Sequence, residues 1–330
     1  MALVRRTLPG SGQATPANLQ RLPGGGNNRL FRLELPGGTV VLKRYFRHPG
    51  DPRDRLDSEF RFSQFLWRRG LRSLPEPLYR DDETGTGFYR HVQGTAPSQV
   101  ADRQLQEAVS FLEQANEGRL EPEALALPYA SEACFTLQQH LDLVGNRVRR
   151  LIEIPQATGT AAEAASLVKE RLLPAWEAVL GDCLRLAAEG GVDPLAPLQY
   201  DDRVLSPSDF GFHNALDTGH GLIFHDFEYA GWDDPAKTAC DFFCQVAVPV
   251  PLRHWGEASV AWARLTRAPE QTLRRMQLLL PAYRIKWVCI VLNHFLAVDG
   301  ERRRFAKGDP ELHLAEQLNL AHCLLSSMNA

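Results

Sequence analysis

Three oxygen-bearing side chains, Asp209, Asn214 and Asp226, follow one another in a short stretch of the sequence. Asn214 comes five residues after Asp209, and Asp226 follows a polar turn at 217–221 and the apolar run 222–224. A hairpin there would place all three around one point. Carboxylate and amide oxygens suit Mg²⁺, which is held by few protein groups together with nucleotide phosphates. Phosphoryl transfer uses such a set, in which one Asp accepts the proton of the substrate hydroxyl while an Asn and a second Asp hold the metal.

Each of these side chains also has an ordinary structural explanation. Asp209 and Asn214 are typical of a loop with side-chain-to-backbone turns, and Asp226 could cap the end of a strand. The combination favours the chemical interpretation, because the apolar strand leads directly into Asp226.

A cation is predicted inside the sheet that precedes this segment. Alternation along residues 39–46 puts Val41, Lys43 and Tyr45 on one face of a strand. A charged side chain there needs a partner, and Glu59 on the following helix is the natural one. Such a strand-Lys to helix-Glu pair positions nucleotide phosphates in kinases. The alternative is that Lys43 lies on the solvated face of an edge strand.

Gly24, Gly25 and Gly26 lie in a glycine-rich turn between two strand-like segments. Without side chains, such a turn lets backbone N–H groups approach phosphates closely. It matches neither the Walker pattern nor a strict G-x-G-x-x-G spacing, and a plain hairpin turn explains it equally well.

The elements that must position these residues change character near residue 95. Before it, alternating segments at 30–35, 39–46, 75–80 and 86–92 predict strands, and a helix is expected from about Asp51 to Gly70. After it, apolar spacing predicts helices at 103–116, 131–152, 161–189 and 271–297. We therefore predict an α+β fold in two lobes, residues 1–95 with a small sheet and one helix, and residues 96–330, mainly helical.

Composition excludes several other classes of protein. Hydrophobic residues make up 44% and charged residues 23%, as in ordinary globular proteins. Thirty-seven Lys and Arg against 40 Asp and Glu leave a net charge of -3, which gives no positive excess to bind nucleic acid. The six cysteines form no CxxC pair, which favours reduced core thiols. No secretory signal or membrane span is visible, so we expect a cytoplasmic protein, with its oligomeric state left open.

These motifs resemble those of the aminoglycoside phosphotransferase and choline kinase superfamily, relatives of the protein kinases. Residues 208–214 are similar to the family's HGDxxxxN loop, and residues 226–231 to its metal-binding IDxxxAG or DFEYA segment. The resemblance implies a protein-kinase-like bilobal fold with an antiparallel N-terminal sheet. It also implies that ATP is the co-substrate and Mg²⁺ the metal.

The same resemblance implies a role for each matched residue. Asp209 would be the base, and Asn214 and Asp226 the Mg²⁺ ligands. Lys43 would contact the α- and β-phosphates, with Glu59 orienting it. The remaining nucleotide contacts would come from the glycine-rich turn, from Val41 and from the lobe connection at His91 and Val92.

Two departures from the family pattern leave a rival function open. Pro207 and Ser208 replace the usual His-Gly, and Gly211 stands where many relatives carry His or Lys. The leading hypothesis is a kinase of small-molecule hydroxyl groups, and the rival is a non-catalytic nucleotide-binding regulator. A protein kinase is disfavoured, since no activation segment follows Asp226.

The acceptor is harder to predict from the sequence. Glu228 and Asp233 could attract a cationic acceptor, and Trp232 could contribute to an aromatic box for a quaternary amine. Surface solvation of the acids and a core role for the indole are the alternatives. Amino alcohols, sugars and aminated sugars all fit this interpretation.

Overall fold

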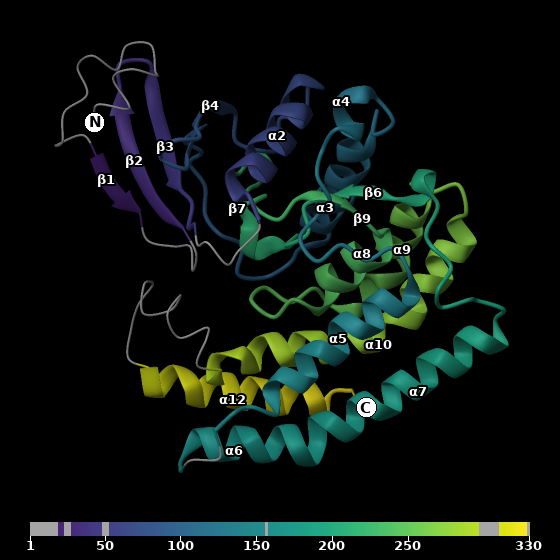
Figure 1. Ribbon diagram of the computed structural model, residues 1–330. Coiled ribbons are helices and arrows are strands. Elements are labelled where there is room, and N and C mark those ends of the chain that lie inside the picture. The colour runs from purple at the N-terminus through teal and green to yellow at the C-terminus, as the bar shows by residue number, and fades with distance from the viewer. Residues whose placement is uncertain (1–18, 23–27, 48–52, 156–157, 297–309, 329–330) are drawn as a thin grey trace. The chain divides into compact units, whose positions relative to one another are not determined.

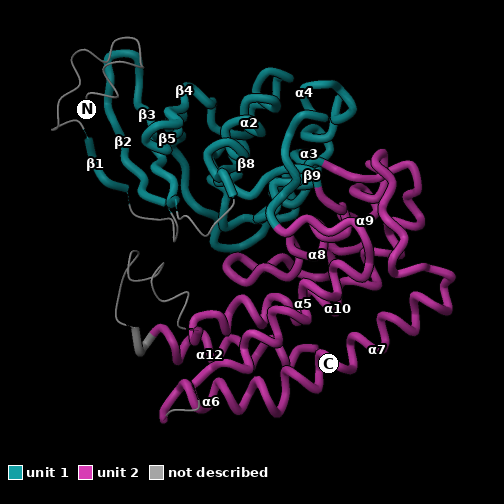
Figure 2. Tube along the Cα trace, in the orientation of Figure 1, with its two compact units in different colours: residues 1–131, 205–232 teal, residues 132–204, 233–330 magenta. Residues whose placement is uncertain are grey.

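The computed structural model describes residues 19–22, 28–47, 53–155, 158–296 and 310–328. The chain forms two compact units that interleave along the sequence (Figure 2): unit 1 holds residues 1–131 and 205–232, and unit 2 holds 132–204 and 233–330. The lobe boundary expected near residue 95 is a different division and stays a prediction.

An antiparallel five-stranded sheet in unit 1 confirms the predicted strands (Figure 1). Its spatial order is β1-β2-β3-β5-β4. The strands are β1 (Leu19–Leu22), β2 (Arg29–Leu35), β3 (Gly38–Arg44), β4 (Pro77–Asp81) and β5 (Thr86–Arg90). Gly38 closes the β2–β3 turn at φ +115°, a conformation that favours glycine. Leu33, Val40, Leu42 and Phe88 form the core of the sheet.

Helix α2 (Arg55–Arg68) packs against this sheet. It was expected to begin near Asp51, which lies outside the described residues. It begins at Arg55 because the Asp54 side chain accepts the N–H of Asp57, a typical N-cap. Gly70, at φ +93°, follows its end as predicted.

Most of the predicted catalytic segment, residues 205–232, also belongs to unit 1, and the segment forms short strands. β7 (Ala215–Asp217) pairs with β8 (Leu222–Phe224) as the expected hairpin, and β6 (Val204–Ser206) pairs with β9 (Gly231–Asp233). Helices α3 (Asp102–Asn116) and α4 (Pro122–Leu125) complete this part of the unit.

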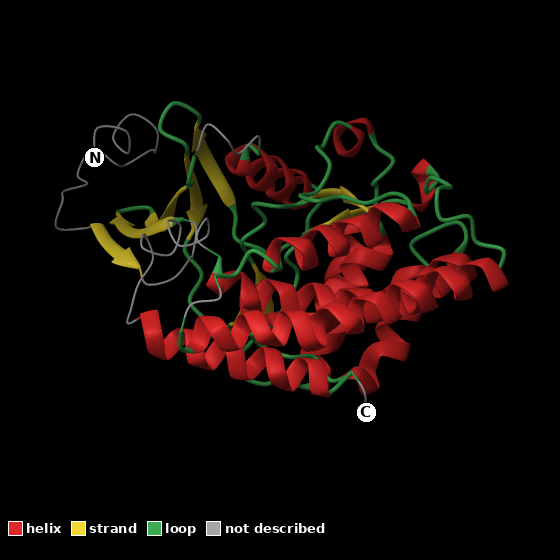
Figure 3. Cartoon of the chain, turned by 60° about the horizontal axis from the view of Figure 1, so that its bottom comes forward, coloured by secondary structure: helices red, strands yellow, loops and turns green. Residues whose placement is uncertain are grey.

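Unit 2 is mainly helical, as predicted for the later part of the chain. Figure 3 draws the helices of the chain in red. Helix α10 packs against α5, α7, α8, α9 and α12. The α-helices are α5 (Leu137–Leu151), α6 (Thr160–Leu167), α7 (Leu173–Glu189), α8 (Pro235–Cys244), α9 (Trp255–Ala263), α10 (Pro269–Leu292) and α12 (Pro310–Ser326). Short 3-10 turns lie at Tyr200–Asp202, Leu252–His254 and Asn293–Phe295.

Two helix predictions differ from the structure in their details. The helix expected from residue 131 begins at Leu137, because Thr136 and Gln139 form a capping box. The helix expected over 161–189 is divided by a π-helical turn at Val168–Leu172. Pro174 follows that turn and has no N–H to donate, so regular α-helical bonding is interrupted there.

Among the described residues, five cysteines are buried and Cys323 is exposed, so the expectation of core thiols holds for five of the six. All six are free thiols. Within the same described part of the chain, no helix is long and apolar enough to cross a membrane.

A buried polar cluster joins three helices of unit 2. His140 on α5 lies 2.7 Å from the Tyr283 hydroxyl of α10 and 3.1 Å from Asp234, the N-cap of α8. Since a carboxylate only accepts, His140 donates through Nε2 and accepts from Tyr283 through Nδ1. Both ring nitrogens of the neutral imidazole are thereby satisfied. Burial lowers the pKa of His140, and the Asp234 carboxylate offsets this only in part.

We expect this histidine to make unfolding depend on pH. Its pKa is lower in the folded chain than the ordinary value of about 6.5, so the unfolded chain takes up the proton first as pH falls. Stability is present above pH ~6.5 and declines below it by at most about 1.4 kcal/mol per pH unit from this group. When the unfolding free energy is measured by denaturant at several pH values, it should change less steeply with pH in His140→Gln than in the wild type. An unchanged slope in that variant, or an equal change in the exposed control His220→Gln, would contradict the assignment.

Candidate active site

Lys43 is buried in unit 1 between two carboxylates. It lies on β3 opposite Leu30 and Gly87, with 7% of its side chain exposed. Its Nζ is 2.6 Å from Glu59 Oε2 on α2 and forms a second ion pair with Asp226 Oδ1. The structure therefore brings Lys43 and Glu59 together with Asp226, which lies 183 residues after Lys43.

The opposite charges of this cluster favour each other's ionised forms. Burial alone would lower the pKa of Lys43, but Asp226 and Glu59 outweigh it and raise that pKa, which keeps the ammonium charged. Burial also raises the pKa of Glu59, to about 7, even though Lys43 opposes the shift. Burial acts in the same direction on Asp226, but there Lys43 prevails and holds the pKa of the carboxyl below its usual value.

Tyr45 and Tyr89 extend the cluster, and neither was predicted as a site residue. The Tyr45 hydroxyl donates to Glu59 Oε2 at 2.8 Å and lies 2.9 Å from the Tyr89 hydroxyl. The two-residue alternation that placed Lys43 also places Tyr45 on the same face. That alternation was the signal that could have identified Tyr45, whereas Tyr89 on β5 had none.

Asp209 stands at the exposed end of the catalytic segment, with 40% of its side chain accessible. Asn214 Nδ2 donates to the Asp209 backbone carbonyl at 3.0 Å and lies 3.4 Å from Asp209 Oδ2. A 3-10 turn at Phe212–Asn214 makes this approach possible across five residues. The predicted proximity of Asp209 and Asn214 is therefore present.

Buried phenylalanines hold both aspartates in place. Phe210 and Phe227, which directly follow Asp209 and Asp226, both stack on Phe111 of α3, at ring-centroid distances of 5.6 and 5.9 Å. Because each aromatic side chain is fixed in the core, the carboxylate beside it is held at the surface of that core.

The β7–β8 hairpin brings Asn214 and Asp226 to neighbouring positions. Ala215 pairs with Phe224, and the His225 N–H donates to the Asn214 carbonyl at 2.9 Å. Asp226 itself has φ +67°, in the left-handed region. Such backbone strain in a non-glycine residue is concentrated at functional sites.

The oxygen donors fit a Mg²⁺ ion. The Nδ2 group of Asn214 is engaged with Asp209, so its amide oxygen is the atom left to bind a metal. Asp226 uses Oδ1 for Lys43, which leaves Oδ2. Two protein oxygens completed by phosphates are typical of Mg²⁺, whereas an all-protein cage is not. No group of three His, Cys, Asp or Glu side chains arranged for a metal is found in the described part of the chain.

Ser208 occupies the position that is glycine in the HGDxxxxN motif, and its backbone conformation is one that favours glycine. Its φ is +66°, where a side chain costs about 1–2 kcal/mol. Ser208→Gly removes that strain but frees the unfolded chain, so we expect a gain of about 0.5–1 kcal/mol in unfolding free energy. In the control Ser110→Gly, inside α3, the same change should destabilise the fold by about as much. Equal signs in the two denaturation experiments would contradict the argument.

Other predicted residues have partners inside the chain. Glu228 accepts from Asn28 at 3.0 Å and lies 3.6 Å from Arg55. Trp232 is 1% exposed and donates to the Ala124 carbonyl, and Asp233 is 0% exposed and pairs with Lys237 at 2.7 Å. Their burial fits a role in packing.

The residues predicted to contact the nucleotide are only partly described. Val41 is half-buried on β3, and Val92 is half-buried after β5. The His91 backbone N–H donates to the Thr39 carbonyl at 3.0 Å, so this N–H is already hydrogen-bonded to β3. Gly24, Gly25 and Gly26 lie outside the described residues.

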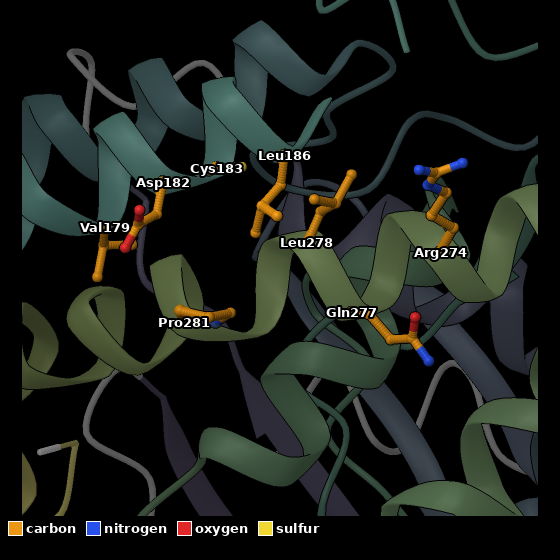
Figure 4. A pocket seen from close by; sticks show the side chains of 8 residues that line it. All are labelled: Val179, Asp182, Cys183, Leu186, Arg274, Gln277, Leu278 and Pro281. Carbon is orange, nitrogen blue, oxygen red and sulfur yellow. The ribbon is translucent and has the colours of Figure 1, made fainter. Parts of the chain in front are cut away.

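Two hollows in the described structure lie away from these residues. One of about 430 Å³ lies in unit 1 and is lined by residues of α3 and the β7–β8 hairpin. The other, of about 360 Å³, lies between α7 and α10 in unit 2 (Figure 4). Cys183, Leu186 and Leu278 are among its lining residues. Neither hollow is lined by the Lys43 cluster or by Asp209.

The sheet with its buried Lys–Glu pair, followed by a loop with Asp and Asn and a second Asp, defines a kinase-like α+β protein. The sequence model of the phosphotransferase enzyme family matches residues 18–279. The chain belongs to this family.

Solved structures of similar fold cover nearly the whole chain. Choline kinase from Cryptosporidium parvum Iowa II has a TM-score of 0.57 at 12% identity, covering 99% of this chain and 94% of its own. Macrolide 2′-phosphotransferase from Brachybacterium faecium has a TM-score of 0.57 at 18% identity, with 96% and 97% covered. Spectinomycin phosphotransferase, in complex with ADP and spectinomycin, has a TM-score of 0.54 at 11% identity, with 92% and 93% covered. These similarities establish the fold. No curated protein sequence gave a match.

Proposed function

We propose that the protein is an ATP- and Mg²⁺-dependent phosphotransferase that moves the γ-phosphoryl group to a hydroxyl of a small molecule. The observation that carries this proposal is the position of Lys43, which contacts both Glu59 and Asp226. The segment that contains Asp226 also holds Asp209 and Asn214 in contact with each other. A plain structural ion pair would need only one of the two carboxylates.

Each residue has a defined task in this reaction. Lys43 binds the α- and β-phosphates, and Glu59 orients its ammonium. Asp226 and Asn214 would hold the metal, which would neutralise charge on the phosphates. Asp209 accepts the proton of the acceptor hydroxyl. At the same time the hydroxyl oxygen bonds to the γ-phosphorus, and the bond from that phosphorus to ADP breaks. The accessibility of Asp209 suits this role, because the base must reach a substrate.

The nucleotide base belongs at the connection that follows β5. Since the His91 N–H is engaged with Thr39, we assign the main adenine contact to Val92, with Val41 packing against the ring. In this proposal residues 1–95 form the nucleotide-binding lobe, and residues 96–330 form the catalytic and acceptor lobe.

The proposed acceptor is an amino alcohol, a sugar or an aminated sugar. Support comes from the family and from neighbours of the same fold that are named as kinases of choline and of spectinomycin. The reduced thiols and the use of ATP fit a cytoplasmic location.

An acceptor panel tests this proposal. Purified protein with Mg-ATP is offered amino alcohols, sugars, amino sugars and nucleosides, and ADP release is followed. We expect ADP release that depends on both acceptor and Mg²⁺. Thermal stabilisation by Mg-ATP without turnover on any acceptor would instead indicate a nucleotide-binding regulator.

A further inference from the structure

His213 lies against the proposed base, although the sequence did not suggest a role for it. It follows Asp209 by four residues within the 3-10 turn Phe212–Asn214. Its Nε2 is 3.1 Å from Asp209 Oδ1, and 20% of its side chain is exposed. Its other ring nitrogen, Nδ1, is buried and has no hydrogen-bond partner in the described structure.

The chemistry of the contact assigns the tautomer. A carboxylate accepts hydrogen bonds, so Nε2 must carry the hydrogen that faces Asp209. Asn214 lies on the other carboxylate oxygen, at 3.4 Å. Asp209 is therefore held from both sides, His213 on Oδ1 and Asn214 on Oδ2. The terminal torsion of an aspartate is otherwise broad, and a carboxylate this exposed would turn freely.

We propose that His213 is a positioning residue that fixes the carboxylate of Asp209 toward the acceptor hydroxyl. This inference rests on the function proposed above. His213 acts through Asp209, and its buried Nδ1 has no bond within the described structure to lose. A side chain that supplies only a donor at the place of Nε2 should therefore substitute for it.

The test compares His213→Gln, His213→Asn and His213→Ala with the wild type. The Gln amide nitrogen reaches the place of Nε2, whereas that of Asn reaches only the place of Nδ1. With the acceptor found by the panel, we expect Ala and Asn to lower kcat about 10- to 100-fold, with KM for ATP within about twofold. Gln should stay within about threefold of the wild type. Adding His213→Ala to Asp209→Asn should cause little further loss.

Other outcomes overturn the proposal. Unchanged kcat in the Ala variant, or a better rescue by Asn than by Gln, would contradict a role through Nε2. If the Ala variant does not fold, the Gln and Asn pair still decides.

A second measurement separates this inference from the proposed function. The ¹⁵N NMR signals of His213 should show hydrogen on Nε2 in the wild type and a changed signal in Asp209→Asn. If the wild type transfers no phosphate but shows this signature, the function fails while the contact stands. If transfer occurs without the signature, the inference about His213 fails alone.

Discussion

Replacing Asp209 by Asn is expected to lower kcat by about 10²- to 10⁴-fold, the usual contribution of a general base. The amide keeps the shape of the side chain but cannot accept the hydroxyl proton as the new bond to phosphorus forms. Mg-ATP affinity, measured by calorimetry, should change little, because Lys43, Asp226 and Asn214 are untouched. The loss should therefore fall on the chemical step.

A matched control is Asp142→Asn on α5, which removes an exposed carboxylate in unit 2. Its kcat should stay within about twofold of the wild type, as expected of a surface change. Full activity in Asp209→Asn would contradict the assignment of the base.

Replacing Lys43 by Met should have the largest combined effect on binding and stability. Glu59 is buried, and the charge of Asp226 raises its pKa while Lys43 lowers it. Without Lys43, the two carboxylates would repel each other with no cation between them. Breaking a buried ion pair from one side costs about 3–5 kcal/mol, so the unfolding free energy should fall by about that amount. Nucleotide affinity should fall as well, because the phosphate contact is lost.

A second variant separates the two effects. In Lys43→Met with Glu59→Leu the buried carboxylate is removed too, so denaturant unfolding should recover part of the loss while Mg-ATP binding stays weak. Lys169→Met, an exposed lysine, serves as the control. A loss below about 1 kcal/mol in Lys43→Met would show that Lys43 is not a buried partner of these carboxylates.

Much of this site could be predicted from residue type and spacing alone. The alternation of residues 39–46 placed Lys43 in the sheet, and the need of a buried cation for a partner pointed to Glu59. The apolar run before Asp226 likewise predicted β8 and the hairpin that brings Asn214 near it. These are local patterns, or pairs forced by burial, and such features leave a trace in the sequence.

Features that depend on tertiary packing were not predicted. The contact between Tyr45 and Glu59 depends on how α2 lies on the sheet, and the left-handed conformation of Ser208 has no signal in a serine. His213 meets Asp209 only because a 3-10 turn brings residues four apart together. The burial of Trp232 and Asp233 depends on partners that sequence spacing does not reveal.

The most direct test of the central claim follows the phosphoryl group itself. ATP labelled with ¹⁸O at the three non-bridging γ-oxygens is incubated with Mg²⁺, the protein and the panel of acceptors. The masses of the products are then measured by mass spectrometry. Transfer to a hydroxyl predicts a phosphorylated acceptor that carries all three heavy oxygens, joined through the acceptor's own light oxygen. Label confined to unreacted ATP or to inorganic phosphate, with every acceptor unchanged, would contradict the account.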